Sequence, residues 1–178
     1  MTDGEVVRAV LAGDTERYGE LVRRYRDRYA RYATRMLGSL DVAEDALQDA
    51  FVRAYDQLAQ CRDPDNFAGW FFLILRNRCF AERRHRAREG PAPFDIVAAT
   101  VPAPGRSDGA VEQLEQRQAL QRALLELTPE QREVFVLKHV EELSYEEIAA
   151  RVGASVASLK MRMHRAYDRL RAQLQGRV

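Results

Sequence analysis

The sequence predicts an all-α protein with two small helical domains joined by a flexible linker. Apolar residues recur at three- and four-residue steps in both halves of the 178-residue chain, and no alternating apolar run bounded by turn residues favours a strand. Between the halves, residues 89–111 hold four of the six prolines and show no sustained helical period. We therefore expect domains at residues 1–88 and 112–178, with a linker at residues 89–111.

The first domain is expected to begin with two helices. Asp14 can cap the first helix, which Gly38 ends, and Asp41 with Glu44 fits a capping box at the start of the second. Their apolar faces consist of Tyr18, Leu21, Val22, Tyr25, Tyr29, Tyr32, Met36 and Leu37 in the first helix and of Leu47, Phe51, Ala54 and Leu58 in the second. The second helix leaves a polar face to solvent or to a partner: Asp45, Gln48, Asp49 and Asp56.

A third helix is expected over residues 67–87, after the turn-like segment CRDPDN, whose last residue, Asn66, can cap it. This helix is apolar at its start and cationic at its end. Its aromatic residues are open to two interpretations. Helical spacing with Leu73 and Leu75 favours packing in the core, but aromatic rings beside cations can also hold unstacked bases. The residues concerned are Trp70, Phe71 and Phe72.

The second domain is expected to open with a supporting helix from about Val111 to Leu127. Thr128 then offers a cap, Pro129 a first helical residue and Gln131 the partner of a capping box. These signals predict that the chain restarts as a new helix here.

A helix-turn-helix is expected to follow. Ser144 and Glu147 repeat the capping-box spacing, Gly153 provides the corner, and Ser155 can cap the last helix. The last helix has an apolar stripe of Val156, Leu159, Met163, Ala166 and Leu170. Its opposite face holds Ala157, Ser158, Met161, His164 and Arg165, flanked by Lys160 and Arg162.

This layout suits a helix laid in the major groove of DNA, where small or hydrogen-bonding side chains meet base edges and flanking cations meet phosphates. The alternative is an amphipathic helix whose charged face is solvated. For Met161, packing against another helix is a further alternative, because methionine readily fills gaps.

Composition limits the remaining classes of function. The net charge of +1 gives no overall attraction to nucleic acid, so only the distribution of charge can support DNA binding. Cys61 and Cys79 have no metal-ligand spacing, the three histidines form no cluster, and no phosphate-binding glycine motif occurs. We therefore expect a cytoplasmic protein that is not an enzyme, with no cofactor, no metal and no membrane contact of its own.

The quoted motifs also carry a family resemblance. The segment LTPEQREVFVLKHVEELSYEEIAARVGASVASLKMRMHRAYDRLR closely resembles region 4 of bacterial sigma factors of the extracytoplasmic-function (ECF) group. In the front half, DVAEDALQDAFVRAYDQL is similar to region 2.2, and FAGWFFLILRNRCFAERRHRA is similar to regions 2.3 and 2.4. The ordered set covers nearly the whole chain.

The resemblance implies a promoter-specificity subunit that binds core RNA polymerase, reads the minus-35 element as duplex and reads and opens the minus-10 element. The implied minus-35 residues are Ser155, Ser158, Lys160, Met161, Arg162, His164 and Arg165. The implied minus-10 residues are Asp65 and Asn66 in a specificity loop, with Arg76, Asn77, Arg83 and Arg84. The implied polymerase-binding residues are Asp45, Gln48, Asp49 and Asp56, which would dock the clamp helices of the largest subunit; the polymerase flap is a further implied contact.

The resemblance also implies an anti-sigma partner. Two other functions compete with the sigma-factor interpretation: a helix-turn-helix regulator that acts without polymerase, and an interaction protein that does not read DNA. The first leaves region 2 unexplained, and the second requires a degraded basic helix, whereas this one is intact.

Overall fold

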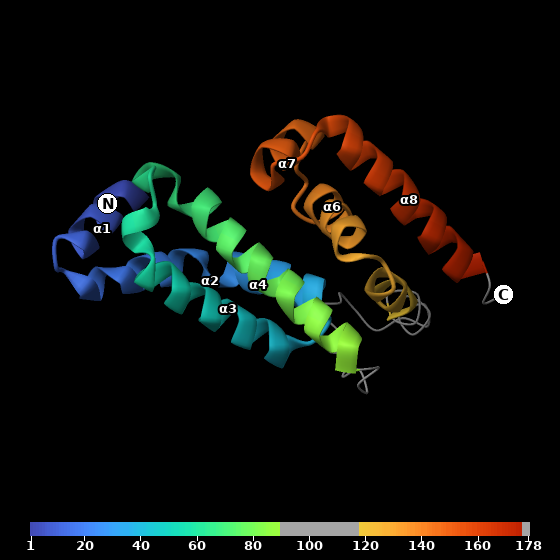
Figure 1. Cartoon of the computed structure of the whole chain (residues 1–178), viewed down its shortest axis with the longest axis horizontal. Helices are drawn as coiled ribbons and strands as arrows, with labels where there is room; N and C mark the ends of the chain where they lie inside the picture. Colours follow the sequence, from blue (N-terminus) through green and yellow to red (C-terminus); the bar gives the residue numbers. More distant parts are fainter. Residues whose placement is uncertain (90–117, 176–178) are drawn as a thin grey trace, which may run out of the picture. The chain divides into compact units, whose positions relative to one another are not determined.

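The computed structural model describes residues 1–89 and 118–175, and the chain divides into two compact units, Met1–Ala92 and Pro93–Val178. We call residues 1–89 the first unit and residues 118–175 the second unit. Regular structure in these residues is helical throughout, which confirms the all-α fold (Figure 1). Apart from Glu89, which ends a helix, the expected linker at 89–111 lies outside the described residues, as does the start of the helix expected from Val111.

The first unit contains four α-helices: α1 (Asp3–Leu11), α2 (Tyr18–Leu37), α3 (Leu40–Asp56) and α4 (Phe67–Glu89). Short 3-10 turns connect them: η1 (Thr15–Arg17), η2 (Leu58–Gln60) and η3 (Pro64–Asn66). The three long helices pack against one another in every pairing, and α1 covers the turns that lead into α4 (Figure 1).

Three local details differ from the sequence expectation. The helix α1 was not predicted, although Thr2 and Glu5 form a complete capping box at its start. Asp14 does not cap α2; its carboxylate accepts a hydrogen bond from Arg17 Nε at 2.6 Å, and η1 intervenes. Asp41 lies inside α3, because Ser39, two residues earlier, is the residue that caps it.

The core of the first unit is aromatic. Phe71 is fully buried, with its ring 4.3 Å from that of Phe51 and 5.1 Å from that of Tyr29, measured between centroids. The Tyr29 hydroxyl donates to the Ala68 carbonyl oxygen at 2.7 Å, so the polar end of this buried side chain is satisfied. Gly38 ends α2 in the left-handed conformation, as predicted, with φ at 75°.

The second unit consists of a helix that includes residues 118–125, followed by α6 (Pro129–His139), α7 (Tyr145–Val152) and α8 (Val156–Gln175). Thr128 and Gln131 form the predicted capping box, with proline at the first helical position. The core gathers where α6 and the helix at 118–125 meet α8. It includes Ala123, Leu127, Ala166 and Leu170, with Leu124 and Phe135 packed against them.

Candidate functional site

The helix-turn-helix expected in the second unit forms as α7 and α8. Ser144 and Glu147 make a capping box in which the Ser144 N–H donates to the Glu147 carboxylate at 2.7 Å. This hydrogen bond is the main cause that lowers the pKa of the Glu147 carboxyl. Gly153 ends α7 with φ at 69°, and the Ser155 hydroxyl accepts from the Ser158 N–H at the start of α8. The local predictions for this motif are confirmed.

The inner face of α8 is buried and its outer face is open. Leu159, Met163, Ala166 and Leu170 are buried, as predicted, whereas Met161 is 52% exposed. The interpretation that Met161 packs against a neighbouring helix is therefore wrong within this unit. Of the other residues assigned to the minus-35 element, four are exposed: Ser155, Lys160, His164 and Arg165. The remaining two, Ser158 and Arg162, are half-buried.

Two lysines lie against the first residue of α7. The Nζ atoms of Lys138 and Lys160 lie 5.2 and 5.8 Å from the ring centroid of Tyr145, the first residue of α7. Across residues 1–89 and 118–175, no carboxylate pairs with Arg162 or Arg165. The outer face of α8 therefore offers positive charge that its own unit does not neutralise.

The aromatic residues of α4 mostly serve the core. Phe71 and Phe72 are buried, as the helical spacing indicated, and Trp70 is half-buried beside Phe67, with 5.9 Å between ring centroids. The expectation that Leu73 packs in the core is wrong: Leu73 is 40% exposed, because it lies on the side of α4 that faces away from the buried rings. Of these residues, only Trp70 presents an aromatic surface toward solvent.

Several cations of α4 bind groups of their own unit. The Arg76 guanidinium lies 4.5 Å from the centroid of the Phe80 ring, and Arg83 donates to the Met36 carbonyl oxygen at 3.4 Å. Asn77 and Arg84 are exposed. Of the four residues that the resemblance assigned to minus-10 DNA on this helix, Asn77 and Arg84 are therefore the most accessible to a partner.

The loop at residues 61–66 brings Asp65 and Asn66 to the start of α4. Both side chains are exposed. Asp65 pairs with Arg8 of α1, with 3.6 Å between Nη1 and Oδ2, and the Asn66 carboxamide lies against Gly69 in the first turn of α4. The Cys61 thiol donates to the Asp63 carbonyl oxygen within the loop, and burial raises the pKa of that thiol.

The acidic face of α3 is also present. All four residues assigned to polymerase binding, Asp45, Gln48, Asp49 and Asp56, are exposed. Asp49 also accepts a hydrogen bond from Arg78 Nε of α4 at 2.9 Å, and Arg78 reaches Glu82 at 3.1 Å. The sequence pattern did not predict this link between α3 and α4.

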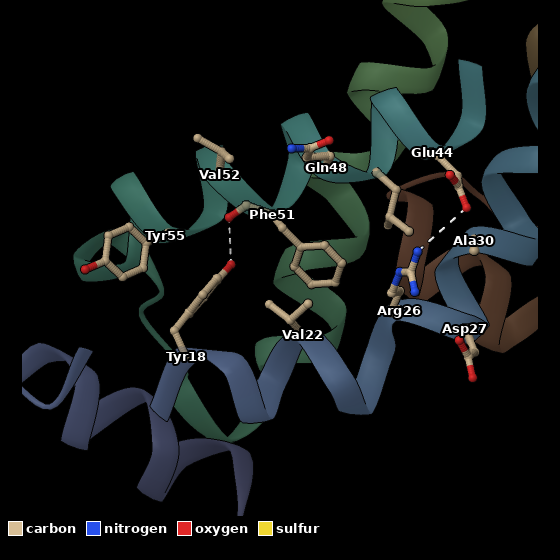
Figure 2. Close-up of a pocket in the computed structure, with 11 residues that line it drawn as sticks. Tyr18, Val22, Arg26, Asp27, Ala30, Glu44, Gln48, Phe51, Val52 and Tyr55 are labelled. Carbon is tan, nitrogen blue, oxygen red and sulfur yellow. Dashed lines mark hydrogen bonds and ion pairs between the residues drawn. The ribbon is translucent and has the colours of Figure 1, made fainter. Parts of the chain in front are cut away.

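A groove of about 600 Å³ lies between α2 and α3 (Figure 2). At one end the Tyr18 hydroxyl donates to the Phe51 carbonyl oxygen at 2.7 Å, and at the other Arg26 pairs with Glu44 at 3.7 Å. Its lining also includes Val22, Ala30, Leu47, Gln48, Val52 and Tyr55. No sequence pattern predicted this groove. The exposed apolar residues Val52 and Tyr55, which lie beside the predicted acidic face, are the signal that could have indicated it.

Among the described residues, no group of three histidine, cysteine or carboxylate side chains could hold a metal ion. No helix in that part of the chain is long and apolar enough to cross a membrane.

A helix-turn-helix with an open cationic face, beside a separate all-helical unit, is typical of a DNA-binding protein. Comparison with known proteins identifies the family. The sigma-70 region 2 family matches residues 21–89, and the sigma-70 region 4 family matches residues 117–170. The ECF RNA polymerase sigma factor SigW of Bacillus subtilis is 30% identical over 179 residues, covering 94% of each chain.

Two solved structures are similar over most of the chain. CnrH, in complex with the cytosolic domain of CnrY, is 27% identical with a TM-score of 0.65 and covers 99% of each chain. The sigma factor RpoE of Bartonella quintana, in complex with the anti-sigma factor NepR, is 28% identical with a TM-score of 0.64; the match covers 90% of this chain and 98% of that one.

The chain belongs to the ECF group of the sigma-70 family of RNA polymerase sigma factors. It is a sigma factor that directs promoter recognition by RNA polymerase. Sigma factors are non-catalytic subunits of the polymerase, which confirms the expectation that this protein is not an enzyme.

Proposed function

We propose that the second unit reads the minus-35 element as duplex DNA with α8 in the major groove. The observation that carries this proposal is the division of α8 into a buried apolar face and an open face with unneutralised cations. Arg165, on the open face, suits a base edge, and Lys160 and Arg162 suit the phosphates on either side. The remaining contacts come from Ser155, Ser158, Met161 and His164.

The first unit, in this proposal, recognises and melts the minus-10 element. Asp65 and Asn66 read an unstacked base, because both side chains are exposed and carry hydrogen-bonding groups at the start of α4. Arg84 and Asn77 bind the adjacent backbone, and Trp70 supplies the accessible ring. Arg76 and Arg83 contribute charge while also holding their own unit together.

Core polymerase docks on α3 through the clamp helices of its largest subunit, while region 4 meets the flap. The acidic side chains at positions 45, 49 and 56 suit a basic partner helix. Gln48 belongs both to this face and to the groove between α2 and α3, so an apolar side chain of the polymerase could enter beside the ion pairs (Figure 2). Residues 1–88 thus carry polymerase and minus-10 binding, residues 112–178 carry minus-35 binding, and residues 89–111 link them.

An anti-sigma protein is the proposed regulator. RpoE of Bartonella quintana, which is similar over most of this chain, forms a complex with an anti-sigma factor. The two surfaces that this regulator would cover have opposite charge: α3 carries Asp45 and Asp49, and α8 carries Lys160 and Arg165. A partner that covers both would keep the protein away from polymerase and DNA in the cytoplasm, where transcription takes place.

Run-off transcription on fragmented genomic DNA tests the proposal. Core polymerase with this chain should start at a defined set of promoters, whereas core polymerase alone should not. A gel shift should show weak duplex binding by the free chain and tight, promoter-specific binding by the holoenzyme. Tight specific binding by the free chain at physiological salt would instead favour a regulator that acts without polymerase.

A pair of matched charge reversals tests whether the acidic face of α3 binds core polymerase. Asp45→Lys on α3 should weaken holoenzyme assembly, and Glu16→Lys on η1 should not, although both residues are exposed and both changes add the same charge. Fluorescence titration with labelled core polymerase measures the difference. Equal affinity of the two variants would remove α3 from the proposed interface.

A further inference from the structure

The helix α1 lies outside the segment that matches the sigma-70 region 2 family, which begins at residue 21. It nevertheless packs against η2, which precedes loop 61–66, against η3, which forms the second half of that loop, and against α2 and α4 (Figure 1). Val6, Val7 and Val10 are buried in these contacts. The loop therefore rests on a helix that the family match does not include.

This helix is firmly held at its first turn. The Asp3 carboxylate accepts hydrogen bonds from Arg24 and from the Tyr25 hydroxyl of α2. Arg24 also donates to the Met1 carbonyl oxygen at 3.0 Å, and Thr2 with Glu5 closes the capping box. A support fixed in this way can determine where a side chain of the loop lies.

The contact with the loop is made at Asp65. A methyl group placed on Gly4 would lie 2.1 Å from Asp65 Oδ1, so the carboxylate occupies space that only glycine leaves open. Arg8, one turn further along α1, pairs with the other carboxylate oxygen at 3.6 Å. We propose that Gly4 and Arg8 are positioning residues that fix the Asp65 carboxylate and thereby set which base the minus-10 loop accepts.

This inference rests on the proposed role of Asp65 in minus-10 recognition. The Arg8–Asp65 pair is exposed on both sides, and such pairs contribute little to stability. A side chain that recognises a base, however, must be held within about 0.5 Å of its productive position. Gly4, which leaves space for the Asp65 carboxylate, and Arg8, which pairs with it, provide that constraint. The contact therefore affects selectivity more than folding.

The variant Gly4→Ala tests the inference directly. Alanine favours a helix more than glycine does, so α1 itself is not weakened, and the groups that must move are the Asp65 carboxylate and the Arg8 guanidinium, whose Nη2 would lie 2.9 Å from the new methyl group. Gly19→Ala in α2 is the matched control, because its methyl group would meet only the far end of the flexible Arg23 side chain, at 3.3 Å. Arg8→Ala removes the cation, and Arg8→Lys restores it.

The experiment is run-off transcription by reconstituted holoenzyme on a library randomised at the minus-10 and minus-35 elements. Gly4→Ala and Arg8→Ala should change the preference at one or more minus-10 positions by about fivefold or more, the loss expected when a base contact is displaced. Minus-35 preferences and core affinity should stay within about twofold of the parent chain, a range too small to reflect a lost base contact. Arg8→Lys should recover much of the parent preference.

An unchanged minus-10 profile in both variants, with promoter-specific transcription by the parent holoenzyme, would overturn the inference. So would an equal change in Gly19→Ala. If the parent holoenzyme itself shows no promoter preference, the proposed function has failed instead. Circular dichroism identifies an unfolded Gly4→Ala chain, in which case Arg8→Ala and its lysine rescue decide the outcome.

Discussion

The two long basic helices, α4 in the first unit and α8 in the second, use their cations differently. In α4, Arg78 pairs with Asp49 and Glu82, and Arg83 donates to the Met36 carbonyl oxygen. In α8, the outer face carries Arg165, which meets no carboxylate of the described residues. The cations of α4 therefore help to hold their own unit together, whereas Arg165 on the outer face of α8 forms no ion pair within the described residues.

The buried faces of the two helices differ as well. The inner face of α4 carries phenylalanines whose rings pack against rings of α2 and α3, whereas that of α8 carries Leu159, Met163, Ala166 and Leu170. Aromatic side chains bury more apolar area each, so single substitutions should cost the first unit more. A loss of DNA binding caused by a change in α4 must therefore be separated from a loss of folding.

The largest effect is expected for Phe71→Ala, which should lower the free energy of unfolding of the first unit by about 3–5 kcal/mol. Phe71 is fully buried against Phe51 and Tyr29. The chain has one tryptophan, Trp70, so its fluorescence in a urea titration reports the first unit alone. The control Leu159→Ala should leave the Trp70 curve in place, and a shifted curve would show that the two units unfold together.

Arg165→Ala should have the next largest effect, a loss of about 1–3 kcal/mol in holoenzyme binding at one position of the minus-35 element. Lys160→Ala should weaken all sequences alike and lower the salt dependence, as expected for a phosphate contact. Arg169→Ala, an exposed arginine one turn further along α8, is the matched control. Identical promoter profiles for the Arg165 and Lys160 variants would contradict the assignment of α8 to the major groove.

A smaller effect separates two adjacent arginines of α4. Arg83→Ala should lower the free energy of unfolding by about 1 kcal/mol, because it removes a hydrogen bond to a backbone carbonyl. Arg84→Ala should change it by less than about 0.5 kcal/mol, because Arg84 is exposed. Trp70 fluorescence in a urea titration measures the free energy of unfolding of both variants. Equal losses would show that Arg83 stabilises the first unit no more than Arg84 does.

The smallest effect concerns the acid stability of the second unit. The pKa of Glu147 in the folded chain lies below its ordinary value of 4.5, so its stabilising contribution is complete above that pH and is lost as the pH falls through the folded value. Glu147→Gln should keep the capping box, as Gln131 does in α6, and remove this part of the acid sensitivity. Hydrogen exchange of the Ser144 amide between pH 3 and 7 measures it; an unchanged pH dependence in the variant would count against the cap as its source.

The sequence alone determined the features that depend on neighbouring residues. The capping boxes at Thr128 and Ser144, the helix-ending glycines at positions 38 and 153 and the apolar stripe of α8 all follow from spacings of a few residues, and the structure confirms them. Two predicted caps do not form: Ser39 caps α3 in place of Asp41, and the Asp14 carboxylate pairs with Arg17 instead of capping α2. Local patterns permit several caps, and small differences in backbone geometry choose among them.

Only the tertiary structure decided which cations form ion pairs and what supports loop 61–66. Asp49 and Arg78 are 29 residues apart in the chain, and Arg8 meets Asp65 across an even longer separation. Neither pair leaves a periodic signal, because each depends on how whole helices pack. The buried valines of α1 show the same dependence on packing. A helix as short as α1 is only marginally stable in isolation, so its contacts with α2, α4 and the loop stabilise it.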